Sequence, residues 1–223
     1  MRIIPRSFFN QTLSDDPEPA EVPGCGSEHI LNPSVMAQLC TLLLDTLSIG
    51  WLKCIHQQAT SPVRATAIPP PTIEGMTCAR GIAKLLTDGP LESTIIAISG
   101  KTQSNDKYTF AVSLAILGED GQTIDQRDLT GGQCAGILQL SPIHDRFQGR
   151  SGKLAWQLEG DDVLFGKKGE GASLMLTADL KHCVFNHVVT LDVDVVYDAT
   201  AWRGDWCVEL DVDTLEIWRG IEP

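Results

Sequence analysis

A cysteine and a histidine ten residues apart are the first candidates for chemistry in this sequence. Cys134 lies in a glycine-rich stretch, residues 131–136, and His144 and Asp145 follow it. A thiol nucleophile needs a base within hydrogen-bond reach and a third group that orients the base, so these three residues are candidates for nucleophilic catalysis. Adjacent residues on an extended chain point in opposite directions, however, which would separate His144 from Asp145. The pattern therefore favours a Cys134 without a catalytic role.

The densest group of potential metal ligands consists of His182, Cys183 and His187. On a strand, the odd separation of the two histidines puts them on opposite faces. His187 falls in phase with Phe185 and Val189, on the apolar face. We therefore predict no metal site and no cofactor. We expect His187 to be a hydrogen-bonded core histidine, or alternatively the polar group of an internal cavity with a catalytic role.

Carboxylates recur in two similar segments, Leu-Asp-Val-Asp at residues 191–194 and again at residues 210–213. Side chains alternate across a strand, so the aspartates of each segment share one face and the aliphatic residues the other. The connection between the two segments has the length of a long hairpin loop. We expect two paired antiparallel strands with one buried face and one exposed acidic face, which keeps the sheet soluble and does not hold calcium.

Tryptophans gather around the connection between these segments. Trp202, Arg203 and Trp206 lie in or beside it, and Trp218 follows. Tryptophan and arginine supply large contact areas at recognition surfaces. These four residues are the candidate binding residues, although at least two of the tryptophans are expected to belong to the core.

The N-terminal part of the chain predicts an acidic arm and two helices. Residues 10–30 are rich in Asp, Glu, Pro and Gly, which favours an extended arm. Asn32 and Pro33 are typical of a helix start, and apolar residues at helical spacing predict a helix over 33–58. Three consecutive prolines at 69–71 indicate a linker over residues 59–72, and a second helix is predicted over 73–87.

From residue 92 onward the apolar residues alternate with a period of two, which is typical of strands. In residues 108–116 the large side chains occupy one face and the small ones, Thr109, Ala111 and Ser113, the other. Small side chains leave room inside a barrel. Glycine-rich turns at 118–121, 159–162 and 167–171 predict hairpins. A bulge near Thr214 is needed to keep Leu215 on the buried face.

Composition excludes several classes of function. The 223-residue chain has a formal net charge of −12, so a nucleic-acid partner is not expected. Charged residues interrupt every apolar run before it reaches the length of a membrane span. Seven scattered cysteines and the lack of a secretion signal predict free thiols in a cytoplasmic protein, with a targeting role of the N-terminal arm as an alternative.

Together these patterns predict a mainly β protein with an antiparallel barrel or sandwich and two packed N-terminal helices. The expected division is an acidic arm at 1–31, a helical segment with a Pro-rich linker at 32–91, and a β domain at 92–223. We expect a binding module that engages a protein partner, or a second copy of itself, through its helix, arm or Trp-bearing loop. The alternative is a cofactor-free isomerase or cyclase that takes a small apolar ligand into a barrel.

Overall fold

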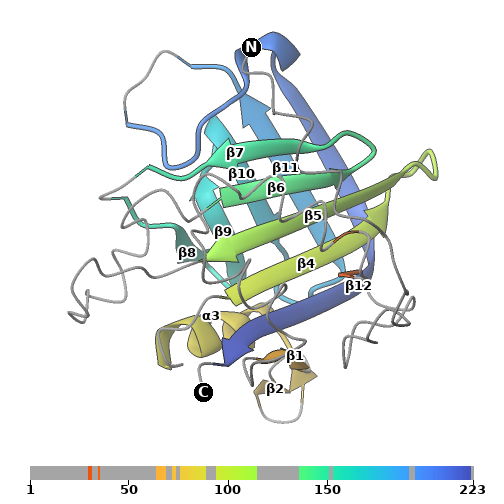
Figure 1. Ribbon diagram of the computed structural model, residues 1–223, viewed down its shortest axis with the longest axis vertical. Coiled ribbons are helices and arrows are strands. Elements are labelled where there is room, and N and C mark those ends of the chain that lie inside the picture. Colours follow the sequence, from red (N-terminus) through yellow and green to blue (C-terminus); the bar gives the residue numbers. More distant parts are fainter. Residues whose placement is uncertain are drawn as a thin grey trace, which may run out of the picture.

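The computed structural model describes residues 30–31, 35, 64–68, 72–73, 76–88, 94–114, 136–150, 153–190 and 194–221. Most of them form one antiparallel sheet in the order β7-β6-β5-β4-β12-β11-β10-β9-β8, with β1 as a further partner of β12 (Figure 1). A mainly β fold is thus confirmed. The elements are β1 (Arg64–Ile68), β2 (Thr72–Ile73), β3 (Met76–Thr77), α3 (Ala79–Asp88), β4 (Thr94–Lys101), β5 (Lys107–Leu114), β6 (Gly136–Ser141), β7 (Asp145–Gln148), β8 (Trp156–Glu159), β9 (Asp162–Lys167), β10 (Glu170–Leu176), β11 (His182–Val188), the 3-10 helix η2 (Ala201–Arg203) and β12 (Trp206–Ile221).

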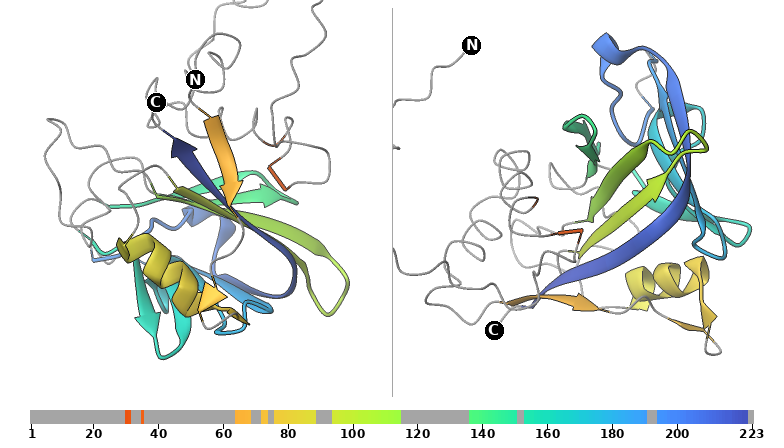
Figure 2. Two further views of the ribbon diagram at one scale, coloured as in Figure 1. Left: turned by 90° about the horizontal axis from the view of Figure 1, so that it is seen from below. Right: turned by 90° about the vertical axis from the view of Figure 1, so that its right-hand side faces the viewer.

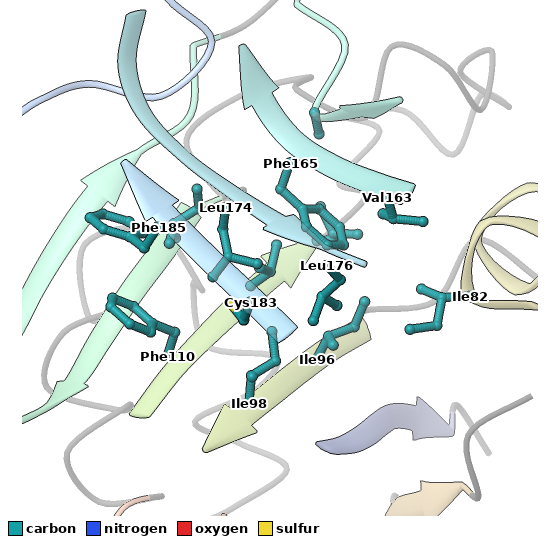
Figure 3. Packing of buried hydrophobic residues seen from close by; sticks show 14 of the residues in the cluster. Ile82, Ile96, Ile98, Phe110, Val163, Phe165, Leu174, Leu176, Cys183 and Phe185 are labelled. Carbon is teal, nitrogen blue, oxygen red and sulfur yellow. The ribbon is translucent and has the colours of Figure 1, made fainter. Parts of the chain in front are cut away.

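The sheet bends so strongly that its two halves face each other across one apolar core (Figure 2). Phe110 on β5 stacks on Phe185 of β11 with ring centroids 4.7 Å apart, and Phe147 of β7 lies 5.1 Å from Phe185. The sheet is not closed, because β7 and β8 stand at its two ends and do not pair with each other. Figure 3 shows this packing for Ile82, Ile96, Ile98, Phe110, Val163, Phe165, Leu174, Leu176, Cys183 and Phe185.

One helix, α3, packs against β8 and β9 in the described part of the chain. Its buried residues, Ala79, Ile82, Ala83 and Leu86, recur at the spacing of a single helical face. The helix ends at Asp88, one residue after the predicted end, but it begins six residues later than residue 73 because 72–73 and 76–77 pair as the β2–β3 hairpin. The expectation of two packed helices is therefore not supported, and the predicted helix at 33–58 lies outside the described residues except for position 35.

The segment expected to be only a linker contains a strand. β1 runs antiparallel to the second half of β12, from Arg64 opposite Ile221 to Ile68 opposite Ile217. The prolines predict an extended conformation. An extended segment can also pair with a free strand edge of suitable register. Linker and edge strand have the same local pattern, so the sequence could not separate them.

The longest strand, β12, contains the predicted bulge. Its register against β4 shifts between Val212 and Thr214. The extra residue moves Leu215 and Ile217 onto the core side, where Ile217 is fully buried. Glu216 and Trp218 consequently face the other side of the sheet. There the Glu216 carboxylate accepts hydrogen bonds from the backbone N–H groups of residues 30 and 31 and from Nε1 of Trp218.

Two other strand predictions need correction. In the described part of the chain, residues 210–212 pair with β11 and β4 instead of the first acidic segment, and β11 sets His182 opposite Asp211. Residues 191–193 lie outside the described residues. The apolar phase of Cys183, Phe185 and His187 determines this register, and Asp194 lies in a turn. The small side chains of β5, Thr109, Ala111 and Ser113, lie on the face opposite Phe110 and Val112, so they do not enlarge the interior.

Hairpin turns formed where glycine predicted them within the described residues. Gly160 joins β8 to β9 and Gly169 joins β9 to β10, both with positive φ. The predicted turn at 118–121 lies outside the described residues. No helix in the described part of the chain has the length and apolar character that a membrane crossing requires.

A short segment, residues 195–198, fastens one end of the sheet. Backbone hydrogen bonds join it to β7 and its continuation, from Asp198 N to Gln148 O (2.8 Å) and from Arg150 N to Val196 O (2.9 Å). On the other side the Tyr197 carbonyl accepts from Ala172 N of β10 (3.1 Å). The Tyr197 hydroxyl, fully buried, donates to Ala155 O beside β8 (3.1 Å). This segment thus connects strands from both halves of the sheet.

Candidate functional site

A buried polar cluster lies at the end of the core between β6, β7 and η2. Gln139 of β6 and Asp145 of β7 are direct cross-strand neighbours, so their side chains share one face. Arg203 of η2 reaches both, with Nη1 donating to Gln139 Oε1 (2.6 Å) and to Asp145 Oδ2 (3.2 Å). The Arg203 and Asp145 side chains are only 9% and 13% exposed. The ion pair of Arg203 and Asp145 therefore holds η2 against β6 and β7.

The Arg203 guanidinium also lies over two aromatic rings. Its Cζ lies 4.4 Å from the ring centroid of Trp206 and 5.6 Å from that of Trp202. A guanidinium over an indole face is attracted by the ring quadrupole, and the attraction is stronger when both groups are removed from water. Hydrogen bonds and stacking together hold the Arg203 side chain in one conformation, which also holds the short helix that carries Trp202.

His187 lies beside this cluster and is fully buried. The backbone N–H of Thr200 donates to Nε2 (2.8 Å), so Nε2 must be the unprotonated nitrogen. Nδ1 lies 2.8 Å from the carbonyl oxygen of Gly204, which can only accept, so Nδ1 carries the proton. Both ring nitrogens of a neutral imidazole are therefore satisfied. His187 is the hydrogen-bonded core histidine that the strand phase predicted.

The surroundings of His187 keep it neutral. Burial is the main cause that lowers its pKa below the ordinary value, and the positive charge of Arg203 acts in the same direction. The hydrogen bond to Gly204 and the carboxylates of Asp145 and Asp205 act in the opposite direction without reversing the shift. Protonation at Nε2 would also set two donors against each other at the Thr200 N–H. The imidazole thus serves to position the loop after β11.

Three exposed apolar side chains surround this end of the sheet, and we call them the Trp202 surface: Ile143 (44% exposed), Val189 (37%) and Trp202 (71%). Contacts of neighbouring residues bring the three segments that carry these side chains to the same end of the sheet. Asp145, two residues after Ile143, contacts the Thr200 hydroxyl at 3.4 Å and Arg203. Asp205 accepts from the Val189 N–H at 2.7 Å.

The predicted binding residues therefore separate into two groups. Trp202, Arg203 and Trp206 lie together, and His187 stacks near Trp206 with ring centroids 5.9 Å apart. Trp218 is fully buried on the opposite face of the sheet, next to Glu216, and takes no part in the cluster. The bulge in β12 is the reason, since it reverses the facing of every later residue.

The other candidates do not assemble into a catalytic group. His144 is exposed in the β6–β7 turn, while the neighbouring Asp145 is held by Arg203 and by the N–H of residue 146. Cys134 lies outside the described residues. Cys183 is buried and its pKa is raised by burial to about 12, so it is not a nucleophile at neutral pH. Cys78 and Cys207 are also free thiols.

The described aspartates of the acidic segments are solvent-exposed, as expected. Asp211 is 73% exposed and pairs with His182, and Asp194 is 61% exposed and pairs with Lys153. Asp213 is also exposed, and Asp192 lies outside the described residues. In the part of the chain that the structure describes, no three His, Cys, Asp or Glu side chains form a group able to hold a metal ion.

Sequence reasoning missed Gln139 and the pairing of Asp145 with Arg203. A polar residue in an apolar strand, such as Gln139 between Leu138 and Leu140, is the one signal that was available. No protein-family model matches this chain, and no curated protein sequence matches it. The geometry of the cluster and of the Trp202 surface is therefore the basis of the functional proposal.

Proposed function

We propose that this protein is a binding module that engages a protein partner through the Trp202 surface. One observation supports this most directly: Trp202 is 71% exposed on a turn whose next residue, Arg203, has a side chain that is only 9% exposed and is hydrogen-bonded. An exposed indole on a fixed support loses little conformational entropy on binding. Tryptophan is also among the residues that contribute most to binding energy at protein interfaces.

The charge of the chain favours a partner with a basic surface around an apolar pocket. The formal net charge is −12, and Asp205 lies exposed three residues from Trp202. A negative protein attracts a positive partner over distances of about a Debye length, which raises the association rate. In this proposal the indole fills the pocket, and the aspartates of the surrounding loops face the basic rim.

The alternative, a cofactor-free isomerase or cyclase, gains less support. It requires a base that is free to exchange protons with a ligand, and His187 was the best candidate. Both nitrogens of His187 are engaged by backbone groups. The interior between the two sheet halves holds stacked aromatic rings, including Phe110, Phe147 and Phe185. These observations favour binding at the surface over chemistry in the interior.

The test compares Trp202→Ala with Lys84→Ala, a control that also removes a long exposed side chain but lies on α3. Partners are captured from lysate with the wild-type protein, purified, and titrated against each variant by calorimetry. We expect Trp202→Ala to weaken the purified complex at least tenfold and Lys84→Ala to leave it unchanged. Association should also slow as salt is raised. Equal affinity of the wild type and Trp202→Ala for every captured partner would overturn the proposal.

A further inference from the structure

The outer edge of β8 carries backbone groups that no described strand pairs with. Gly166 N donates to Ala155 O, so Ala155 and Gly166 form a hydrogen-bonded pair at the start of the β8–β9 ladder. Such pairs alternate along an antiparallel ladder, which directs the backbone N–H and C=O groups of Trp156 and Leu158 away from β9. Within the described residues no strand pairs with this outer edge of β8.

Most side chains along this edge are exposed, although Ala155 is buried. Leu158 is 46% exposed on the same face as the half-buried Trp156, and Leu154, just before the strand, is 47% exposed. Gln157 and Glu159 are exposed on the opposite face. A free edge with exposed aliphatic side chains is a template for pairing with another strand.

The sequence of this edge is complementary to itself. Residues 153–159 read Lys-Leu-Ala-Trp-Gln-Leu-Glu. When two copies run antiparallel with Trp156 opposite Trp156, each Leu154 faces a Leu158 and each Lys153 faces a Glu159. The apolar pairs then share one face of the new ladder and the oppositely charged pairs the other. In this register the residues that exchange backbone hydrogen bonds with the second copy are Trp156 and Leu158, whose N–H and C=O groups already point outward.

We propose that a second copy of this chain pairs with β8 along residues 153–159, so that a two-fold axis through Trp156 joins the two sheets into one. The contact is isologous, since the same patch serves both copies. In a single copy β8 begins at Trp156, and pairing extends it toward Lys153. The exposed ion pair of Lys153 with Asp194 contributes little, so Lys153 is able to exchange this partner for Glu159 of the other copy.

Sedimentation analysis over a range of protein concentrations tests this proposal. The wild type should show a reversible monomer–dimer equilibrium. Lys153→Glu and Glu159→Lys each turn two attractive pairs into two repulsive ones, and each should weaken the dimer about tenfold or more. The double variant restores both pairs with their signs exchanged and should recover the wild-type constant. Circular dichroism and thermal melts of all four proteins verify the fold.

Three results would overturn the proposal: a wild type that stays monomeric at the highest attainable concentration, a dimer that is insensitive to both single changes, or a double variant no better than the single ones. Trp202→Ala is expected to dimerise like the wild type. The outcome is thus independent of the partner proposed for the Trp202 surface.

Discussion

The two ends of the sheet differ in how their edge strands are covered. At the β7 end, residues 195–198 add backbone hydrogen bonds to Gln148 and Arg150 and connect onward to β10 and to the residue before β8. At the β8 end no strand covers the edge within the described residues, and Leu158 is exposed. A bent sheet of this kind needs no pairing of its end strands, because an irregular segment bonded to both halves holds them together. With this arrangement, the outer edge of β8 has no strand partner within the described residues.

The largest expected effect comes from Gly171→Ala, which places a methyl group where the backbone of residues 195–198 packs against β10. Gly171 has a φ of +62°, and a Cβ there would lie 2.1 Å from the Tyr197 carbonyl oxygen. We expect a loss of more than about 3 kcal/mol in the free energy of unfolding, measured by urea denaturation. Gly169→Ala is the control, because Gly169 also has positive φ but no atom within 4 Å of its Cβ position. It should cost only about 1 kcal/mol, and equal losses would refute the role of the contact.

Tyr197→Phe removes only the hydroxyl that links this segment to the β8 half. The hydroxyl donates to Ala155 O in a fully buried position. Ala155 O keeps the hydrogen bond from Gly166 N, so no acceptor is left without a partner. We expect a loss of about 1 kcal/mol in unfolding free energy, together with faster hydrogen exchange of the Ala172 amide. Unchanged exchange at Ala172 would mean that the hydroxyl does not help to hold the segment.

The pH dependence of stability tests how His187 holds the loop that follows residues 195–198, through Thr200 and Gly204. Because the pKa of His187 is lowered in the folded state, the unfolded state binds more protons below about pH 6.5. The unfolding free energy should therefore fall as pH decreases from that value, and the slope should be smaller in His187→Gln. His182→Gln, at an exposed position, is the matched control. Identical slopes in the wild type and His187→Gln would contradict a neutral buried imidazole.

The smallest effect is expected at the uncovered edge. Leu158→Thr changes a side chain that is 46% exposed, so the unfolding free energy of the monomer should change by less than about 0.5 kcal/mol. Its cross-strand neighbour Val163 is fully buried, and Val163→Thr should cost about 1 to 3 kcal/mol. Urea denaturation at low protein concentration compares the two variants. A similar loss in both would show that the β8 edge is covered after all.

Local patterns in the sequence predicted the elements that local physics determines. The alternation of apolar residues located most of the strands from β5 onward, and glycine located the turns at Gly160 and Gly169. The bulge between Val212 and Thr214 followed from a change of phase alone. The phase of His187 likewise predicted its buried position. Each of these features depends on a few consecutive residues.

Features that depend on distant residues were missed. Arg203 and Asp145 are 58 positions apart in the sequence, and nothing in either segment indicates the other. β1 was read as a linker because its partner, β12, lies more than 140 residues away. The predicted bulge also reverses the side-chain direction of Trp218, and this consequence is needed to predict that Trp218 lies apart from the other tryptophans. Pairing over such distances depends on the order of all strands in the sheet, which local sequence patterns do not reveal.

The position of β12 in the sheet has a consequence for how the chain folds during synthesis. The strands β4–β7 and the strands β8–β11 are two meanders, and β12 lies between β4 and β11 as the element that joins them. In the order of synthesis both meanders come before Trp206–Ile221, which joins them only once it docks. Until then each exposes the free edge of a central strand, so the nascent chain passes through a stage with two open templates for mispairing. Chaperone access before β12 docks should therefore affect the yield of folded protein.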